Sequence, residues 1–253
     1  MSGNVVFARK EALEILRTWR IWVLPGILLF FAATGPVLAR YTPEIVSAFA
    51  PDQLGGFQIP TPTHLDAYAQ WVKNLSQIAL FALIIIYAGL VSGESKSGTA
   101  VLVLTKPVSR SAFVVVKSAV HALFFAVVLV LGTLLTWGLT AVAFHTAPGS
   151  PLWSSALVSL VLGELFIAVM TLLSVLIGSS AGAAGAGLGA YALLSIAGMW
   201  KPLARYSPAG LGNDATALAA GTPTDVLWPV VTAFALMVAL VAIAAALYRR
   251  KDL

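Results

Sequence analysis

Few residues of this chain could carry out chemistry, and the nucleophile and base types occur in the wrong order for hydrolysis. Intramembrane serine proteases place a Gly-x-Ser on one helix and a histidine two helices later, and Gly178-Ser-Ser180 offers such a serine. However, all three histidines, His64, His121 and His145, precede that serine. A serine needs an adjacent base to become a nucleophile. We therefore predict no catalytic residue in this chain.

The stretch that comes closest to a phosphate-binding loop fails at one specific residue. Gly93 and Gly98 have the Gly-x-x-x-x-Gly spacing, but Thr99 stands where the loop needs a lysine to meet the terminal phosphates. The chain has no cysteine, so it has neither a disulfide nor a thiolate metal site. We expect this chain itself to bind no nucleotide, cofactor or metal.

One acidic residue lies within a strongly apolar stretch. Glu164 falls near the middle of residues 153–178, where ionisation is costly unless the carboxylate is paired or hydrated. Tyr191 falls at a similar depth in the next apolar stretch. Two interpretations of Glu164 stay open. It is either a substrate-facing acid in a translocation cavity that Tyr191 also lines, or a protonated carboxyl that hydrogen-bonds a neighbouring helix.

The elements that must position these residues are membrane spans. Of 253 residues, 59% are hydrophobic and 10% are charged, and the mean hydropathy is +0.93. An average soluble domain is about 25% charged, and the core of a soluble protein grows too slowly with size to hide this much apolar surface. We therefore predict an all-α integral membrane protein.

Six apolar stretches approach the roughly 20 residues that a helix needs to cross a ~30 Å hydrocarbon layer. They are residues 21–39, 75–92, 113–140, 153–178, 183–200 and 226–248, and we treat 1–253 as one transmembrane domain. Before them, residues 5–20 place Val5 and Leu16 on one helical face and Lys10 on another, which predicts an amphipathic helix in the membrane interface. Residues 40–74 and 201–225 are expected to be long, proline-bearing loops.

The positive charges predict how the chain is oriented. With the N-terminus in the cytoplasm, 11 of the 15 Lys and Arg residues fall inside, and Arg40, Lys73, Lys201 and Arg205 fall outside. This bias follows the positive-inside rule and agrees with an even number of spans. We therefore predict that both termini are cytoplasmic, and the net charge of +5 does not indicate nucleic-acid binding.

The inner loop between the second and third spans, residues 93–112, carries the strongest functional pattern. It reads Glu-Ser-Lys-Ser-Gly-Thr from Glu94 and Lys-Pro-Val-Ser-Arg from Lys106, around a short apolar run. Thr99 can cap a short helix, and Pro107 prevents its continuation. A short apolar helix in the cytosol would leave a sticky surface. The pattern favours docking on another protein, and a helix lying on the inner leaflet is the alternative.

This loop resembles the corresponding loop of type-2 ATP-binding cassette (ABC) permeases. The interfacial N-terminal helix, the six spans and the long outer loop before the sixth span agree with that family. The resemblance implies the membrane subunit of a bacterial exporter, whose short loop helix is a coupling helix that docks on a separate ATPase subunit. By matching position, the coupling residues are Glu94, Gly98, Thr99, Lys106, Pro107 and Arg110.

The resemblance also implies partners. It predicts two copies of an ABC ATPase, which would bind ATP and Mg, and a second permease subunit, identical or homologous. It places the chain in the cytoplasmic membrane as a multi-pass protein. The alternative is a secondary, ion-coupled transporter that needs no ATPase and uses Glu164 as a proton relay. No motif identifies the substrate.

The fifth span carries small residues at helical spacing. Gly178 and Gly182 are four residues apart, and Gly185 and Gly189 repeat the interval beside them. Small residues at this spacing let helix backbones approach closely in lipid. The stripe predicts either a subunit interface or packing within the chain.

Overall fold

The computed structural model describes residues 3–49, 60–96, 98 and 108–251. The described chain is helical and contains no strand, and six of its helices are long and apolar enough to cross a membrane. The prediction of an all-α membrane protein with six spans is therefore confirmed. In chain order the elements are α1 (Gly3–Arg17), α2 (Arg20–Phe49), α3 (His64–Asn74), the π-helix η2 (Leu75–Ala79), α4 (Leu80–Tyr87), α5 (Ser92–Lys96), α7 (Arg110–Phe144), α8 (Gly149–Leu176), α9 (Ser180–Ala197), α10 (Lys201–Tyr206), the 3-10 helix η3 (Pro208–Gly210), α11 (Leu211–Ala219) and α12 (Leu227–Arg249).

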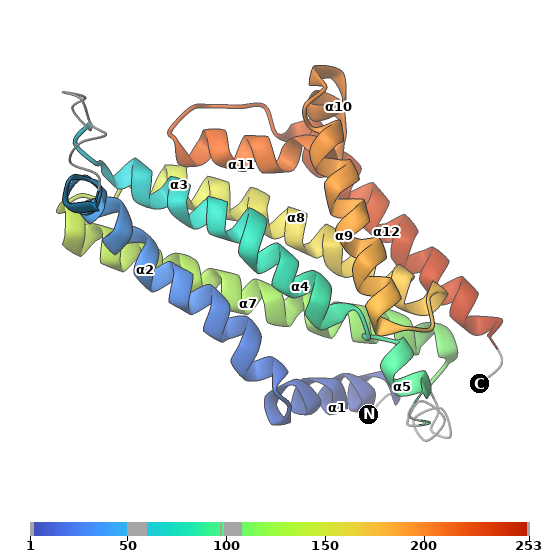
Figure 1. The fold of residues 1–253 in the computed structure, drawn as a ribbon. Helices are drawn as coiled ribbons and strands as arrows, with labels where there is room; N and C mark the ends of the chain where they lie inside the picture. The colour runs from blue at the N-terminus through green and yellow to red at the C-terminus, as the bar shows by residue number, and fades with distance from the viewer. Residues whose placement is uncertain (1–2, 50–59, 97, 99–107, 252–253) are drawn as a thin grey trace.

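The spanning helices form one slanted bundle with α8 at its centre (Figure 1). Helix α8 packs against α4, α7, α9, α11 and α12, and it buries Phe166 and Met170 almost completely. The outer helices turn apolar side chains away from the bundle, and Leu193 of α9 and Val238 of α12 are each 70% exposed. Lipid is the solvent in which such side chains carry no penalty, as expected for helices that are apolar all round.

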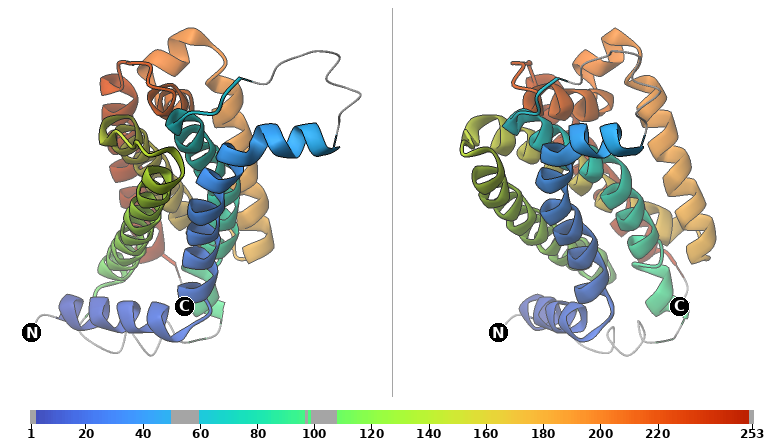
Figure 2. Two further views of the ribbon diagram at one scale, coloured as in Figure 1. Left: turned by 90° about the vertical axis from the view of Figure 1, so that its left-hand side faces the viewer. Right: turned by 60° about the vertical axis from the view of Figure 1, so that its left-hand side comes forward.

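The two ends of the bundle differ. Both termini and α5 lie at one end, and α10 and α11 lie at the other (Figure 1). Helix α1 runs across the bundle at the first end, and the last turns of α2 bend away at the other (Figure 2). Helix α1 buries Phe7, Glu11 and Ile15 against the bundle, whereas Val5 and Leu16 stay exposed. The buried face of this helix is thus separate from the apolar face that the sequence pattern picked out.

The described parts of the expected loop 40–74 are mainly helical, so the expectation of a loop is wrong for residues 40–49 and 64–74. Helix α2 continues past residue 39 to Phe49, and an Arg40–Glu44 ion pair of 4.0 Å lies one turn apart on this extension. The second span is one helical stretch from His64 to Lys96, which begins well before residue 75. Its start is fixed by a capping box, in which Asp66 accepts from the backbone N–H of Thr63. A hydropathy search finds only the apolar part of such helices.

Residues 201–225 also contain helices instead of a plain loop. Helix α11 lies against α8 and α3 at the end of the bundle far from the termini. It buries Leu211, Ala215 and Ala219, which recur every four residues. This narrow apolar stripe is too short to be recognised as a membrane span, but its burial is sufficient to hold the amphipathic helix α11 against the bundle.

Candidate functional site

At the end of the bundle that holds both termini, one buried lysine joins three helices. Lys117 of α7 has a side chain that is 1% exposed. Its Nζ lies 2.6 Å from Oε2 of Glu11 in α1 and 2.7 Å from Oε1 of Glu94 in α5. A buried charge is tolerated only when it is paired and hydrogen-bonded. The position of α1 and α5 is therefore fixed by the ammonium group of Lys117.

A second lysine extends this pairing into a network. Nζ of Lys10 lies 2.9 Å from Oε1 of Glu11, 3.1 Å from Oε1 of Glu94 and 2.5 Å from Oε2 of Glu14. Burial lowers the pKa of Lys10, but its hydrogen bonds to Glu14 and Glu11 outweigh that effect, so its pKa lies above the usual range. The carboxylates of Glu11, Glu14 and Glu94 come close enough together to hold a metal ion, yet each has a lysine partner. The arrangement is that of an ion-pair network. We call Lys10, Glu11, Glu94 and Lys117 the inner ion cluster, after the predicted cytoplasmic position of this end of the bundle.

A ring stack beside the inner ion cluster brings in the last helix. Phe113 of α7 stacks between Phe7 of α1 and Tyr248 of α12, with ring centroids 5.2 and 5.4 Å apart. The hydroxyl of Tyr248 also lies 3.2 Å from Oγ of Ser95 in α5. Helix α1 and the second, third and sixth spanning segments are thus in contact at one end of the molecule.

The structure describes half of the predicted coupling residues. Glu94, Gly98 and Arg110 are described, whereas Thr99, Lys106 and Pro107 lie outside the described residues. Gly98 has a φ of 74°, a left-handed conformation that glycine adopts without strain. Arg110 donates to the backbone oxygen of Lys251, which ties the start of α7 to the end of the chain. Glu94 points toward Lys117 and Lys10, so its described contacts are within this chain.

Tyr191 lines a cavity of about 200 Å³ between α8, α9, η2 and α11. Its hydroxyl donates to the backbone oxygen of Ser76 at 3.1 Å, and Ser76, Gln77 and Asn213 line the same cavity. Ser76 and Gln77 belong to η2, a turn of π-helix, and such turns recur at functional sites. Tyr191 therefore faces a cavity within this chain, and its place in a translocation pathway stays a prediction.

Glu164 does not share this cavity. Leu162 lines it, and Phe166 contacts the Tyr191 ring at 6.0 Å between centroids. Glu164 is two residues from each of them, so it lies about 200° around α8, on the far side of the helix. Glu164 is half-buried, and it makes neither a hydrogen bond nor an ion pair with any described residue. The structure therefore does not bring Glu164 and Tyr191 together in this cavity, because similar depth in the membrane does not fix the helix face; a shared translocation pathway stays a prediction.

The predicted glycine stripe of α9 faces away from its own chain. A Cβ at Gly178, Gly185 or Gly189 would meet nothing within 4 Å, and one at Gly182 would meet only its neighbouring capping segment. The glycine that packs inside the chain is Gly187, where a Cβ would come within 2.5 Å of Met170 Sδ. Packing of the stripe within the chain is therefore not observed among the described residues.

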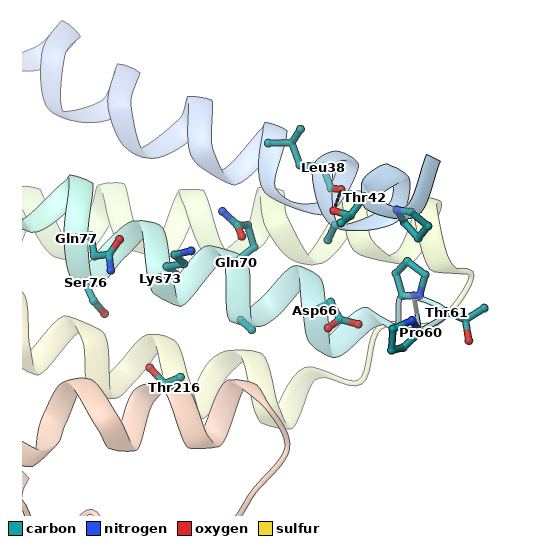
Figure 3. A pocket seen from close by; sticks show the side chains of 14 residues that line it. Leu38, Thr42, Pro60, Thr61, Asp66, Gln70, Lys73, Ser76, Gln77 and Thr216 are labelled. Atoms are coloured by element: carbon teal, nitrogen blue, oxygen red, sulfur yellow. Dashed lines mark hydrogen bonds between the residues drawn. The ribbon is translucent and has the colours of Figure 1, made fainter. Parts of the chain in front are cut away.

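A larger hollow opens between α2 and α3, at the end of the bundle far from the termini (Figure 3). Its volume is about 740 Å³. Asp66, Gln70, Lys73 and Gln77 line it, at spacings of four, three and four residues along one helical stretch. This period places them on one face of the helix. We call this hollow the α2–α3 groove.

Sequence reasoning missed both the inner ion cluster and the α2–α3 groove. The groove had a detectable signal, since the period of its polar residues is helical and Thr63-x-x-Asp66 is a capping signature. No sequence pattern predicts the inner ion cluster, because Glu11 and Lys117 are far apart in the chain and each resembles an ordinary charge at a membrane surface.

Two comparisons place the chain among known proteins. The family described as a protein of unknown function (DUF2705) matches residues 29–253. The probable ABC transporter permease protein NosY of Stutzerimonas stutzeri is 32% identical over 199 residues, which cover 74% of this chain and 64% of that protein. The chain thus matches slightly less than two thirds of the length of this curated relative.

Proposed function

The chain belongs to the DUF2705 family, and we propose that it is the membrane-spanning permease subunit of a type-2 ABC exporter. It would move an unidentified substrate across the cytoplasmic membrane, driven by ATP hydrolysis in a separate ATPase subunit. The observation that carries this proposal is the similarity to a probable ABC transporter permease over 199 residues. The same similarity favours a permease over a secondary transporter.

The inner end of the bundle suits the role of transmitting motion from an ATPase. The predicted coupling loop is flanked by α5 and α7, and the inner ion cluster links both helices to α1. A force on the loop would therefore be passed to the second and third spans and to α1 together. ATP and Mg would be held by the ATPase, and both termini of this chain would be cytoplasmic, as the bias of positive charges predicts.

The exposed face of α9 suits a second permease subunit. Gly185 and Gly189 leave the backbone open to close approach by another helix, which is how small residues promote helix association in lipid. We propose a pair of permease subunits with two ATPase subunits. Replacing Gly185 and Gly189 together by leucine would then abolish the dimer in chemical cross-linking, whereas leucine at Gly138, which also has open space around it, would not.

The coupling role is tested by purification of the ATPase with variants of the tagged chain. Arg110→Ala should reduce the amount of bound ATPase, because losing one charged partner at a desolvated contact costs ~2–5 kcal/mol. Arg205→Ala is the matched control, since Arg205 is an exposed arginine at the opposite end of the bundle. Equal recovery of the ATPase with both variants would contradict the assignment of the coupling loop.

A further inference from the structure

The α2–α3 groove is lined on one side by polar residues of the second spanning segment. Gln70, Lys73 and Gln77 project from the second span toward α2, whose Leu38 and Thr42 form the opposite wall (Figure 3). A row of polar side chains on one face of a spanning helix marks the part of that helix that meets water, lipid headgroups or a polar ligand. Its volume of about 740 Å³ falls within the ~300–1,000 Å³ typical of ligand sites.

The Lys73 end of the groove favours an anion. Asp66 also lines the groove, but it lies seven residues before Lys73, about 10 Å away along the helix. Its Oδ2 accepts from the backbone N–H of Thr63 at 2.7 Å and from the Thr63 hydroxyl at 2.9 Å. Lys73 is exposed and makes no hydrogen bond or ion pair with any described residue. Gln70 and Gln77 lie one turn to either side of Lys73. Gln70 donates one amide N–H to Oδ1 of Asn74 at 3.3 Å, which leaves its second N–H and the Gln77 amide to donate to the same ligand. The Lys73 end of the groove thus offers a positive charge flanked by donors.

The groove lies at the depth of lipid headgroups. Helix α2 begins at Arg20, beside α1, and Leu38 follows eighteen residues later, about 27 Å along the helix. This length is close to the ~30 Å of the hydrocarbon layer. With α1 at one membrane surface, Leu38 and the facing Lys73 therefore reach the other surface. There the last turns of α2 bend away from the bundle (Figure 2).

We propose that the α2–α3 groove binds the anionic phosphate headgroup of a membrane lipid from the leaflet opposite α1. The phosphate meets Lys73 and the amides of Gln70 and Gln77, and the lipid chains run along Leu38 and Ala39 toward the hydrocarbon. Basic residues at this level attract anionic headgroups by about 1 kcal/mol each. Lipid binding in the α2–α3 groove requires no ATPase, so it can be tested independently of the proposed export function.

Native mass spectrometry of the purified, delipidated chain tests the proposal. Phosphatidylglycerol should bind more tightly than phosphatidylcholine. Lys73→Gln should weaken phosphatidylglycerol binding about fivefold, the change that one surface lysine supplies, whereas Lys73→Arg should preserve it. Lys201→Gln is the matched control, because Lys201 is an exposed lysine at the same end of the molecule but outside the groove. Thr42→Trp should abolish binding by filling the hollow.

Three results would overturn the proposal. Equal affinity of Lys73→Gln and Lys201→Gln for phosphatidylglycerol would remove Lys73 from the site. Binding of glycerol 3-phosphate, with no preference for phosphatidylglycerol over phosphatidylcholine, would assign the groove to a free phosphate in solution. Lipid adducts that disappear when the chain dimerises would assign it to a second copy of this chain.

Discussion

Replacing Lys117 by methionine tests whether the inner ion cluster holds α1 and α5 on the bundle. Methionine keeps most of the length of the lysine stem but removes the ammonium group that lies 2.6 Å from Glu11 and 2.7 Å from Glu94. Glu11 is completely buried, so the substitution leaves a carboxylate in the interior, and Lys10 is then its one lysine partner among the described residues. Breaking a buried ion pair in this way costs ~3–5 kcal/mol.

The matched control is Lys10→Met, because Lys10 meets the same two carboxylates but its side chain is 40% exposed. Water screens pairs of this kind, and they contribute only ~0.2–1 kcal/mol. The structure thus predicts that Lys117→Met costs at least three times as much stability as Lys10→Met. Unfolding of the purified chain in mixed micelles, followed by tryptophan fluorescence, measures both free energies.

A double-mutant cycle separates the ion pair from loss of packing. Glu11→Gln combined with Lys117→Met removes both charges, so the pair of substitutions should cost less than the sum of the single ones by ~1 kcal/mol or more. Hydrogen exchange should rise in α1 of Lys117→Met and stay low in the double variant. Two results would refute the inner ion cluster as the anchor of α1. One is an additive loss of unfolding free energy in the double variant, and the other is an equal loss for Lys117→Met and Lys10→Met.

Other features of the chain give three further predictions. Gly163→Ala should destabilise the chain by ~1–3 kcal/mol in the same unfolding assay, because its Cβ would fall 2.2 Å from a ring carbon of Phe125; Gly138→Ala, in open space, is the control. A cysteine at Thr216 should react with an impermeant thiol reagent on intact cells and one at Ser97 should not, and the reverse result would invert the topology. Glu164→Gln should leave stability and transport of cations unchanged, since Glu164 lies on the far side of α8 from the Tyr191 cavity; loss of cation transport would restore a substrate-facing role.

The sequence predicted those parts of the fold that depend on composition along the chain. Apolar runs located the six spans, because crossing hydrocarbon requires a minimum length of apolar helix. The same criterion truncated the second span at residue 75, because the polar residues before it belong to the helix but face the α2–α3 groove. A hydropathy window averages over the residues on all faces of a helix, so it does not detect a polar stripe on one face.

Side-chain partners were much harder to predict. Glu94 was assigned to docking from its place in the loop pattern, yet it lies against Lys117 and Lys10. Such pairing depends on how α1, α5 and α7 pack together at the end of the bundle, and no local sequence pattern predicts that packing. The rotation of α8 was equally hidden, since a span that is apolar all round gives no period to show which face Glu164 occupies.

Purification of the tagged chain from its native membrane, followed by native mass spectrometry, tests the central claim most directly. We predict a complex of two permease subunits with two copies of an ABC ATPase, which hydrolyses ATP. A chain that is isolated without an ATPase, and that transports its substrate in proteoliposomes on an ion gradient alone, would contradict it.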